Sequence, residues 1–277
     1  MPNAAVEHVL SETVRSHRFT IAVVFPIVGA IVILTSARGW LPAPVSFNPL
    51  LLLFGAAIMR LPLIAGLLPV VDRRAAVVLV ALAGYTWAVE FVGVSTGLPY
   101  GTFEYGIQLG PMIHGVPLAL PLFFVPLVLN AYLLVLVIAP RATRRIVVRL
   151  PLAIGAVIAI DLVLDPAAVA VGFWSFDAGG RYYGVPWTNY AGWVLSGTIA
   201  VLAVEIAFSR TALYRRIDRC EYILDDMVSF TLLWGTINLV FGNWIPVVLT
   251  GLFVSGLAVG NRLPIQSPNR LRHDPDV

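Results

Sequence analysis

Residues 116–139 read VPLALPLFFVPLVLNAYLLVLVIA, a run without a single charged side chain. A run of this length can cross the roughly 30 Å hydrocarbon core of a bilayer as one α-helix. Comparable runs fill most of the chain, which has 59% apolar and only 12% charged residues. An ordinary soluble domain carries about a quarter charged residues. The composition therefore predicts an all-α bundle of transmembrane helices that forms a single domain, 1–277.

The apolar runs delimit eight helices of a multi-pass protein of the cell membrane. Only Gly242 and Asn243 separate the last two, so a shorter hairpin is the alternative there. The first apolar run is preceded by Arg15 and Arg18, as in a secretory signal peptide. Because no small-residue cleavage site comes after the run, we interpret it as the first membrane span. The predicted spans are 18–36, 49–70, 75–93, 116–139, 147–166, 191–209, 225–241 and 243–260.

The arginines predict the orientation of this bundle. All 18 basic residues are Arg, and placing the N-terminus inside puts 15 of them in cytoplasmic segments. Arg38 and Arg181 then lie outside, and Arg60 falls within a span. Because cytoplasmic loops retain Arg and Lys, we expect both tails, 1–17 and 261–277, to be cytoplasmic. Anionic lipid headgroups are the expected partners of the basic loops, and nucleic acid is not.

Two predicted external connections, 94–115 and 167–190, differ from the other loops. Both are dense in Tyr, Trp, Phe, Gly and Pro, a composition that suits re-entrant or interfacial segments folded over a bundle. An aromatic belt at headgroup level is the alternative, but a belt would be expected at both faces of the membrane. The cytoplasmic loops are poor in aromatic residues, so the pattern favours a lid or a pocket wall.

Acidic residues within the predicted spans indicate a functional site, because a charge at the bilayer centre costs a few kcal/mol. Asp161 and Asp165 are four residues apart and therefore share one helix face. With Glu90 from the third span and Glu104 from the first aromatic loop, we expect them to converge on one external pocket. Burial favours the protonated form of such a carboxyl, which can then donate a proton.

A purely structural role is the alternative for these acids. The carboxylates would then bind Arg60, Arg181 or backbone groups and fix helix packing. For Glu205, which lies beside the cytoplasmic arginines, this interpretation is preferred. Asn130 and Asn238 are expected to form hydrogen bonds between helices. No metal site is expected, because His114 has no second His or Cys near it and the single cysteine, Cys220, excludes a CxxC motif.

Several motifs between about 85 and 195 together resemble the membrane carotenoid hydratases of the CruF type. They are LPYGTFEY at 98–105, GVP at 115–117, DLVLDP at 161–166, GFWSF at 172–176, YYGVPWTNY at 182–190 and GW at 192–193. The resemblance implies addition of water across the terminal C1–C2 double bond of an acyclic carotenoid end, which gives a tertiary alcohol without a redox cofactor. The substrate would be a C50 polyene, as in the conversion of bisanhydrobacterioruberin to bacterioruberin, or a C40 polyene.

Alkene hydration needs a proton donor, an electron-rich wall for the tertiary carbocation and a positioned water. We expect Asp161 or Asp165 to donate the proton, and Glu90 or Glu104 to orient and deprotonate the water. Asn189 would hold the water or the hydroxyl product. No metal or other cofactor is assigned, and the polyene would enter sideways from the bilayer. The predicted lining of the cation site is Trp87, Tyr100, Phe103, Tyr105, Trp174, Tyr182, Tyr183 and Trp187.

Other functions remain as alternatives. A membrane prenyltransferase also uses Asp-x3-Asp, but it needs a second acidic cluster on the cytoplasmic side, and Asp225 and Asp226 are adjacent, which is the wrong spacing. A proton-coupled transporter would use the buried acids as a relay, but no internal repeat is visible in the sequence. A carotenoid cyclase or isomerase shares the protonation step. Other membrane enzymes of carotenoid synthesis are candidate partners.

Overall fold

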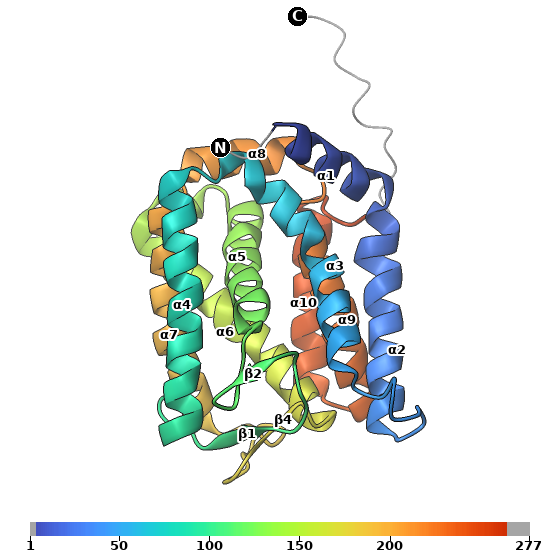
Figure 1. The fold of residues 1–277 in the computed structure, drawn as a ribbon. Helices are drawn as coiled ribbons and strands as arrows, with labels where there is room; N and C mark the ends of the chain where they lie inside the picture. The colour runs from blue at the N-terminus through green and yellow to red at the C-terminus, as the bar shows by residue number, and fades with distance from the viewer. Residues whose placement is uncertain (1–3, 265–277) are drawn as a thin grey trace, which may run out of the picture.

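The protein is described by a computed structural model that covers residues 4–264 (Figure 1). The described residues form ten α-helices and four short strands. The helices are α1 (Ala4–Ser16), α2 (Phe25–Ala37), α3 (Pro49–Leu67), α4 (Arg73–Thr96), α5 (Leu120–Ile138), α6 (Ile146–Ala170), α7 (Trp187–Ala207), α8 (Arg210–Arg219), α9 (Asp225–Phe241) and α10 (Trp244–Val259). The strands are β1 (Phe103–Tyr105), β2 (Met112–Ile113), β3 (Val116–Pro117) and β4 (Trp174–Phe176).

The all-α prediction is confirmed. Among the described residues, six helical segments are long and apolar enough to cross a membrane, and they coincide with the first six predicted spans. α4 and α6 extend beyond those spans, to Thr96 and Ala170. α9 and α10 coincide with the last two predicted spans but are shorter, with 17 and 16 residues. The six segments are Thr20–Ala37, Pro49–Val70, Arg73–Thr96, Leu120–Ile138, Ile146–Ala170 and Trp187–Ala207.

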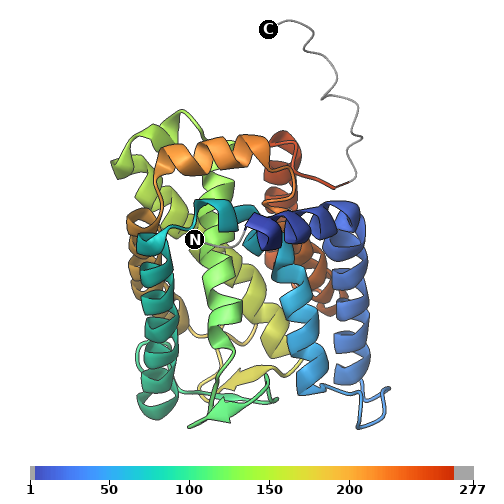
Figure 2. The ribbon, with the colours of Figure 1, turned by 45° about the horizontal axis from the view of Figure 1, so that its top comes forward.

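The long helices stand side by side, and the two ends of the bundle differ (Figures 1 and 2). α1 and α8 lie across one end, here called the arginine end, where the connections α3–α4 and α5–α6 also lie. The four strands lie at the opposite end, the strand end. Most arginines of the described residues are in segments at the arginine end, in agreement with the asymmetry of the sequence. Arg270 and Arg272, with the outer parts of both tails, lie outside the described residues.

The two aromatic loops meet at the strand end and form a cap. β1 from the first loop pairs antiparallel with β4 from the second, so that Phe103 lies opposite Phe176 and Tyr105 opposite Trp174. Side chains alternate between the two faces of a strand. Phe103 and Tyr105 therefore point toward the bundle, whereas Glu104 between them is exposed. β2 and β3 form a separate hairpin in the first loop.

Prolines lie inside α3, α5 and α6, and at Pro126 and Pro166 a side chain from another segment replaces the missing hydrogen bond. Proline has no backbone N–H, so the carbonyl four residues earlier loses its helical donor. In α6, Pro166 leaves the Leu162 carbonyl free, and it accepts a hydrogen bond of 3.1 Å from the hydroxyl of Tyr182 in the cap. In α5, the Leu122 carbonyl four residues before Pro126 accepts a hydrogen bond of 3.3 Å from Nε of Arg60 in α3.

Buried polar contacts join the helices along the length of the bundle. As expected, Glu205 has a structural role, because it pairs with Arg149 of α6 and accepts a hydrogen bond of 2.5 Å from the Tyr132 hydroxyl. The expected interhelical hydrogen bonds of the two asparagines are also confirmed. Asn130 donates to Asp226 at 2.6 Å, and Asn238 donates to the Val163 carbonyl at 2.8 Å.

Candidate active site

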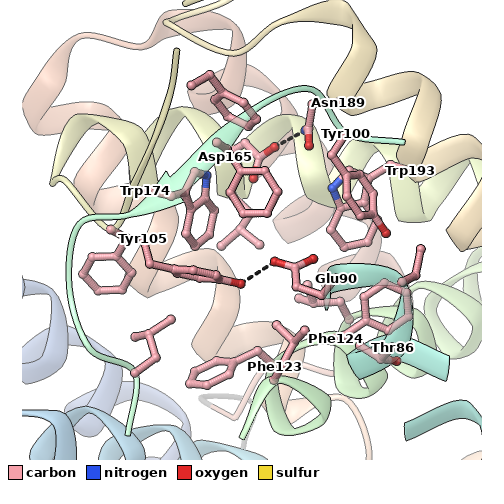
Figure 3. A pocket seen from close by; sticks show the side chains of 18 of the residues that line it. Thr86, Glu90, Tyr100, Tyr105, Phe123, Phe124, Asp165, Trp174, Asn189 and Trp193 are labelled. Carbon is pink, nitrogen blue, oxygen red and sulfur yellow. Dashed lines mark hydrogen bonds between the residues drawn. The ribbon is translucent and has the colours of Figure 1, made fainter. Parts of the chain in front are cut away.

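A cavity of about 120 Å³ lies between the cap and the helices, enclosed by α3 to α7 and α9 (Figure 3). One water needs only about a tenth of that volume, so the space suits a larger occupant. Its polar lining includes Glu90 from α4, Asp165 from α6, Asn189 from α7 and Arg60 from α3. Most of the remaining wall is aromatic, and consists of Tyr100, Phe103, Tyr105, Phe123, Phe124, Phe173, Trp174, Phe176, Trp193 and Trp234.

Asp161 and Asp165 are both buried and share one neutral partner. The spacing of four residues places them one turn apart on α6, facing the start of α7. The Asn189 side-chain amide donates a hydrogen bond to Asp165 and lies 3.4 Å from Oδ2 of Asp161. Oδ1 of Asp161 has no hydrogen-bond partner within the described residues. Asp165 lines the cavity, whereas Asp161 lies behind it.

The alternative pairing of these aspartates with arginine is not observed. Arg60 forms its ion pair with Asp226 of α9, both side chains being buried, and Arg181 is exposed. Among the described residues, no ion pair involves Asp161, Asp165 or Glu90. These carboxyl groups are therefore held by neutral hydrogen-bond donors instead of by cations.

Glu90 faces the same space as Asp165, but from α4 (Figure 3). Its Oε1 accepts a hydrogen bond from the hydroxyl of Tyr105, which the alternation of β1 directs into the cavity. Burial, together with the charge of Glu90, raises the pKa of the Tyr105 phenol well above its usual value. Tyr105 therefore remains a hydrogen-bond donor at neutral pH, and the cap fixes the position of the Glu90 carboxyl.

The aromatic wall is built from edge contacts and one stacked pair. The ring of Tyr105 lies perpendicular to those of Phe103 and Trp174, with centroid distances of 5.8 and 6.4 Å. On the opposite side, Phe124 of α5 stacks on Trp193 of α7 at 5.2 Å. Such packing presents uncharged ring faces and edges toward the cavity, whereas Arg60, which also lines it, is paired with Asp226. A developing cation would be stabilised by the ring faces.

The structure brings part of the predicted site together. Glu90, Asp165 and Asn189 line the cavity, and Asp161 contacts it through Asn189. Glu104, which was expected at the pocket, is exposed because the pairing of β1 turns it outward. Of the eight aromatic residues predicted for the cation site, four line the cavity: Tyr100, Phe103, Tyr105 and Trp174.

The other four predicted aromatic residues lie elsewhere. Trp87 stacks on Phe91 within α4, at a centroid distance of 5.6 Å. Tyr182 and Tyr183 contact each other in the second loop at 4.9 Å, and Trp187, the first residue of α7, is 65% exposed. Tyr182, Tyr183 and Trp187 thus pack with one another beside the second loop, and none of the four residues lines the cavity.

Several cavity residues were not named as site residues from the sequence. Phe173, Phe176 and Trp193 belong to the motifs on which the family resemblance rests, and this membership could have identified them as candidate site residues. Phe123, Phe124 and Trp234 lie within long apolar runs, in which no polar face reveals which side of the helix points inward. Among the residues that the structure describes, no group of three His, Cys, Asp or Glu side chains is arranged to hold a metal ion.

The sequence profile of the family described as "Carotenoid biosynthesis protein" matches residues 47–257, which contain every side chain of the cavity. The chain belongs to the carotenoid biosynthesis protein family. Within this family, it is 56% identical over 245 residues to a bisanhydrobacterioruberin hydratase of Haloarcula japonica. The alignment covers 88% of this chain and 83% of that relative.

This match confirms the resemblance to membrane carotenoid hydratases that the motifs indicate. The matched region of the carotenoid biosynthesis protein family also includes α3 and α9, which lie outside the motif region. No solved structure matches the chain.

Proposed function

We propose that this protein is a carotenoid hydratase that adds water to the terminal double bond of an acyclic carotenoid, such as bisanhydrobacterioruberin. The observation that carries the proposal is that Glu90 and Asp165 face one aromatic cavity from two helices, with no cation paired to either. The similarity to the hydratase of Haloarcula japonica supports the same reaction. No cofactor takes part in the proposed mechanism.

Asp165 is the proposed proton donor. Two buried carboxylates side by side cannot both remain ionised without a cation, so the pair formed by Asp161 and Asp165 holds a proton. Asp165 is the member that lines the cavity, and it transfers that proton to the less substituted carbon of the double bond. Asp161 is a positioning residue, since it acts on the substrate only through Asp165 and Asn189.

The protonated alkene is a tertiary carbocation, which the aromatic wall stabilises. A desolvated ring face contributes up to about 2 kcal/mol to the binding of a cation. Trp174 and Tyr105 flank the space between the two carboxyl groups, and the stacked Phe124 and Trp193 close it from the helices (Figure 3). The same wall excludes bulk water, so capture of the cation is limited to a water inside the cavity.

Glu90 is the proposed base for that water. Its carboxylate, oriented by Tyr105, accepts one proton as the water oxygen bonds to the tertiary carbon. The product is a tertiary alcohol that contains one more water than the substrate. Glu90 is then protonated and Asp165 ionised, and transfer of the proton from Glu90 back to Asp165 through the shared cavity restores the enzyme.

In the membrane, the proposed arrangement has eight crossings in a single domain with both termini in the cytoplasm. The arginine end then faces the anionic cytoplasmic leaflet, as the positive-inside rule requires. The cap and the cavity lie toward the outer face of the cell membrane. α9 and α10 would complete the crossings as a tightly turned hairpin, since only Gly242 and Asn243 separate them.

Expression in a host that accumulates bisanhydrobacterioruberin or lycopene tests the function. We expect pigments whose mass is increased by one or two waters, detected by mass spectrometry after extraction. A cyclase would change the absorption spectrum without a gain in mass, a prenyltransferase would add carbon, and a transporter would leave the pigment unchanged. Any of these three results would contradict the proposed reaction.

A further inference from the structure

A second cavity, of about 220 Å³, adjoins the active-site cavity. It lies between α2, α3 and α9, and it is separated from the first cavity by one layer of side chains. Leu109, Phe123, Phe173 and Trp234 line both spaces. The two cavities are therefore neighbours across a shared apolar wall that contains three aromatic rings.

The lining of the second cavity is suited to a hydrocarbon. Its walls are side chains such as Val28 and Val32 of α2, Leu51 and Phe54 of α3, and Leu233 of α9. Among the described residues that line it, Ser36 and Asn48 carry polar side chains, and none carries a carboxyl group. The second cavity therefore has no groups for acid catalysis, in contrast to the first.

Several residues that line this cavity are also exposed on the outer side of the bundle. Val28 and Leu51 are each 51% exposed, and Phe54 is 59% exposed. These residues lie on the two membrane-spanning helices α2 and α3, and they line the cavity while also facing outward. A hydrophobic molecule dissolved in the bilayer can thus reach the cavity between these helices without passing through water.

We propose that the second cavity binds the polyene chain of the carotenoid while its terminal double bond occupies the active-site cavity. This inference rests on the proposed function and adds the path of the substrate. A long linear polyene exceeds the first cavity, so the chain beyond the reacting end must leave it. The shared wall leads into a lipid-accessible apolar space, and Phe123, Phe173 and Trp234 provide flat ring surfaces along a conjugated chain.

Gly55 of α3 gives a direct way to fill this space. It lines the second cavity but not the first, and a Cβ atom added to it meets no other atom within 4 Å. Gly84 of α4 provides a matched control. Its added Cβ is equally free of neighbours, but it lines neither cavity. Replacement of either glycine by Phe adds the same side chain to an apolar helix.

The experiment compares wild type, Gly55→Phe, Gly84→Phe and Asp165→Asn in lipid nanodiscs supplied with bisanhydrobacterioruberin. We expect Gly55→Phe to lower kcat/KM by about tenfold or more and to lose polyene during purification. Gly84→Phe should match wild type in both measurements. Asp165→Asn should retain the polyene, as measured by its visible absorbance, but should not hydrate it. Val28→Phe, on the helix facing Gly55 across the cavity, should behave like Gly55→Phe.

The outcomes separate the two levels of the proposal. If wild type forms no hydrated product, the proposed function fails. If wild type is active but Gly55→Phe and Val28→Phe retain polyene and turn it over like Gly84→Phe, the second cavity does not bind the chain. Retention of phospholipid that the polyene does not displace would assign the cavity to a lipid acyl chain and overturn the inference. Size-exclusion profiles and thermal unfolding check that each variant is folded. If Gly55→Phe does not fold, the result for Val28→Phe decides whether the second cavity binds the chain.

Discussion

The hydroxyl of Tyr105 in the cap donates a hydrogen bond to the carboxyl of Glu90 in the wall of the helix bundle. This contact connects two segments that are predicted from different signals, an aromatic loop and an acidic residue within a span. It fixes the carboxyl proposed as the base at a defined place in the cavity. The cap is therefore part of the proposed active site as well as its cover.

Tyr105→Phe removes this hydrogen bond while keeping the ring in the aromatic wall. We expect kcat to fall by about tenfold to a hundredfold, because a hydrogen bond to a charged group is worth about 1.5–3 kcal/mol. Retention of the polyene should be unchanged. Tyr214→Phe is the control, since Tyr214 bonds to Thr143 at the arginine end. Equal rates in wild type and Tyr105→Phe would show that the contact does not serve catalysis.

Asp165→Asn and Asp161→Asn should differ in severity. Loss of a general acid typically costs 10²–10⁴-fold in rate, and only Asp165 lines the cavity. We expect hydration to be abolished in Asp165→Asn and reduced less in Asp161→Asn. The exposed Asp177→Asn variant controls for the substitution itself. A greater loss in Asp161→Asn than in Asp165→Asn would exchange the proposed roles of the two residues.

Glu104→Gln tests the geometry of the cap. The sequence makes Glu104 a candidate base, but the pairing of β1 with β4 turns its side chain away from the cavity. We therefore expect hydration rates in Glu104→Gln to match wild type, whereas Glu90→Gln should lose most of its activity. A strong loss in the first variant, measured in the same pigment assay, would mean that β1 has a different register.

Arg60→Met should destabilise the protein, because it leaves Asp226 as a buried charge without its cationic partner. Breaking a buried ion pair typically costs about 3–5 kcal/mol in the free energy of unfolding. The double variant Arg60→Met/Asp226→Leu should recover most of that loss. Arg15→Met breaks an exposed pair with Glu12 and should cost less than about 1 kcal/mol. Denaturant unfolding in detergent micelles measures all three, and a mild Arg60→Met would contradict the expectation.

Hydropathy predicts the helices well, because crossing a bilayer demands long apolar runs and leaves few alternatives. The outward orientation of the Glu104 side chain could not be predicted from the sequence in the same way. The letters FEY at 103–105 fit a short strand that alternates inward and outward, but the strand forms only through its partner at 174–176, some seventy residues later. Strand pairing over such a distance depends on the folded bundle, so a loop without detected strands gave no direction to the side chain.

Arg60 and Asp226 illustrate a second limit. In the sequence, Asp225 and Asp226 are adjacent at the start of a predicted span, and Arg60 is a candidate partner of the site acids. In the structure, the two pair with each other between α3 and α9, and Asn130 of α5 completes the contact. The choice among several buried partners is made by helix packing, which hydropathy does not encode. The direction of Phe123 toward the cavity depends on packing in the same way.

The hydrogen bond from Tyr182 to the Leu162 carbonyl has a consequence for how the protein works in a membrane. Movement of the cap away from the bundle would break this hydrogen bond and leave the Leu162 carbonyl without a donor in a region with little water. An unpaired polar group of this kind costs roughly 2–7 kcal/mol. The cap is thus expected to stay in place, held by this hydrogen bond to α6, the helix that carries Asp161 and Asp165. In the proposed mechanism, the carotenoid would then enter and leave between α2 and α3, and the cap would keep external water away from the carbocation.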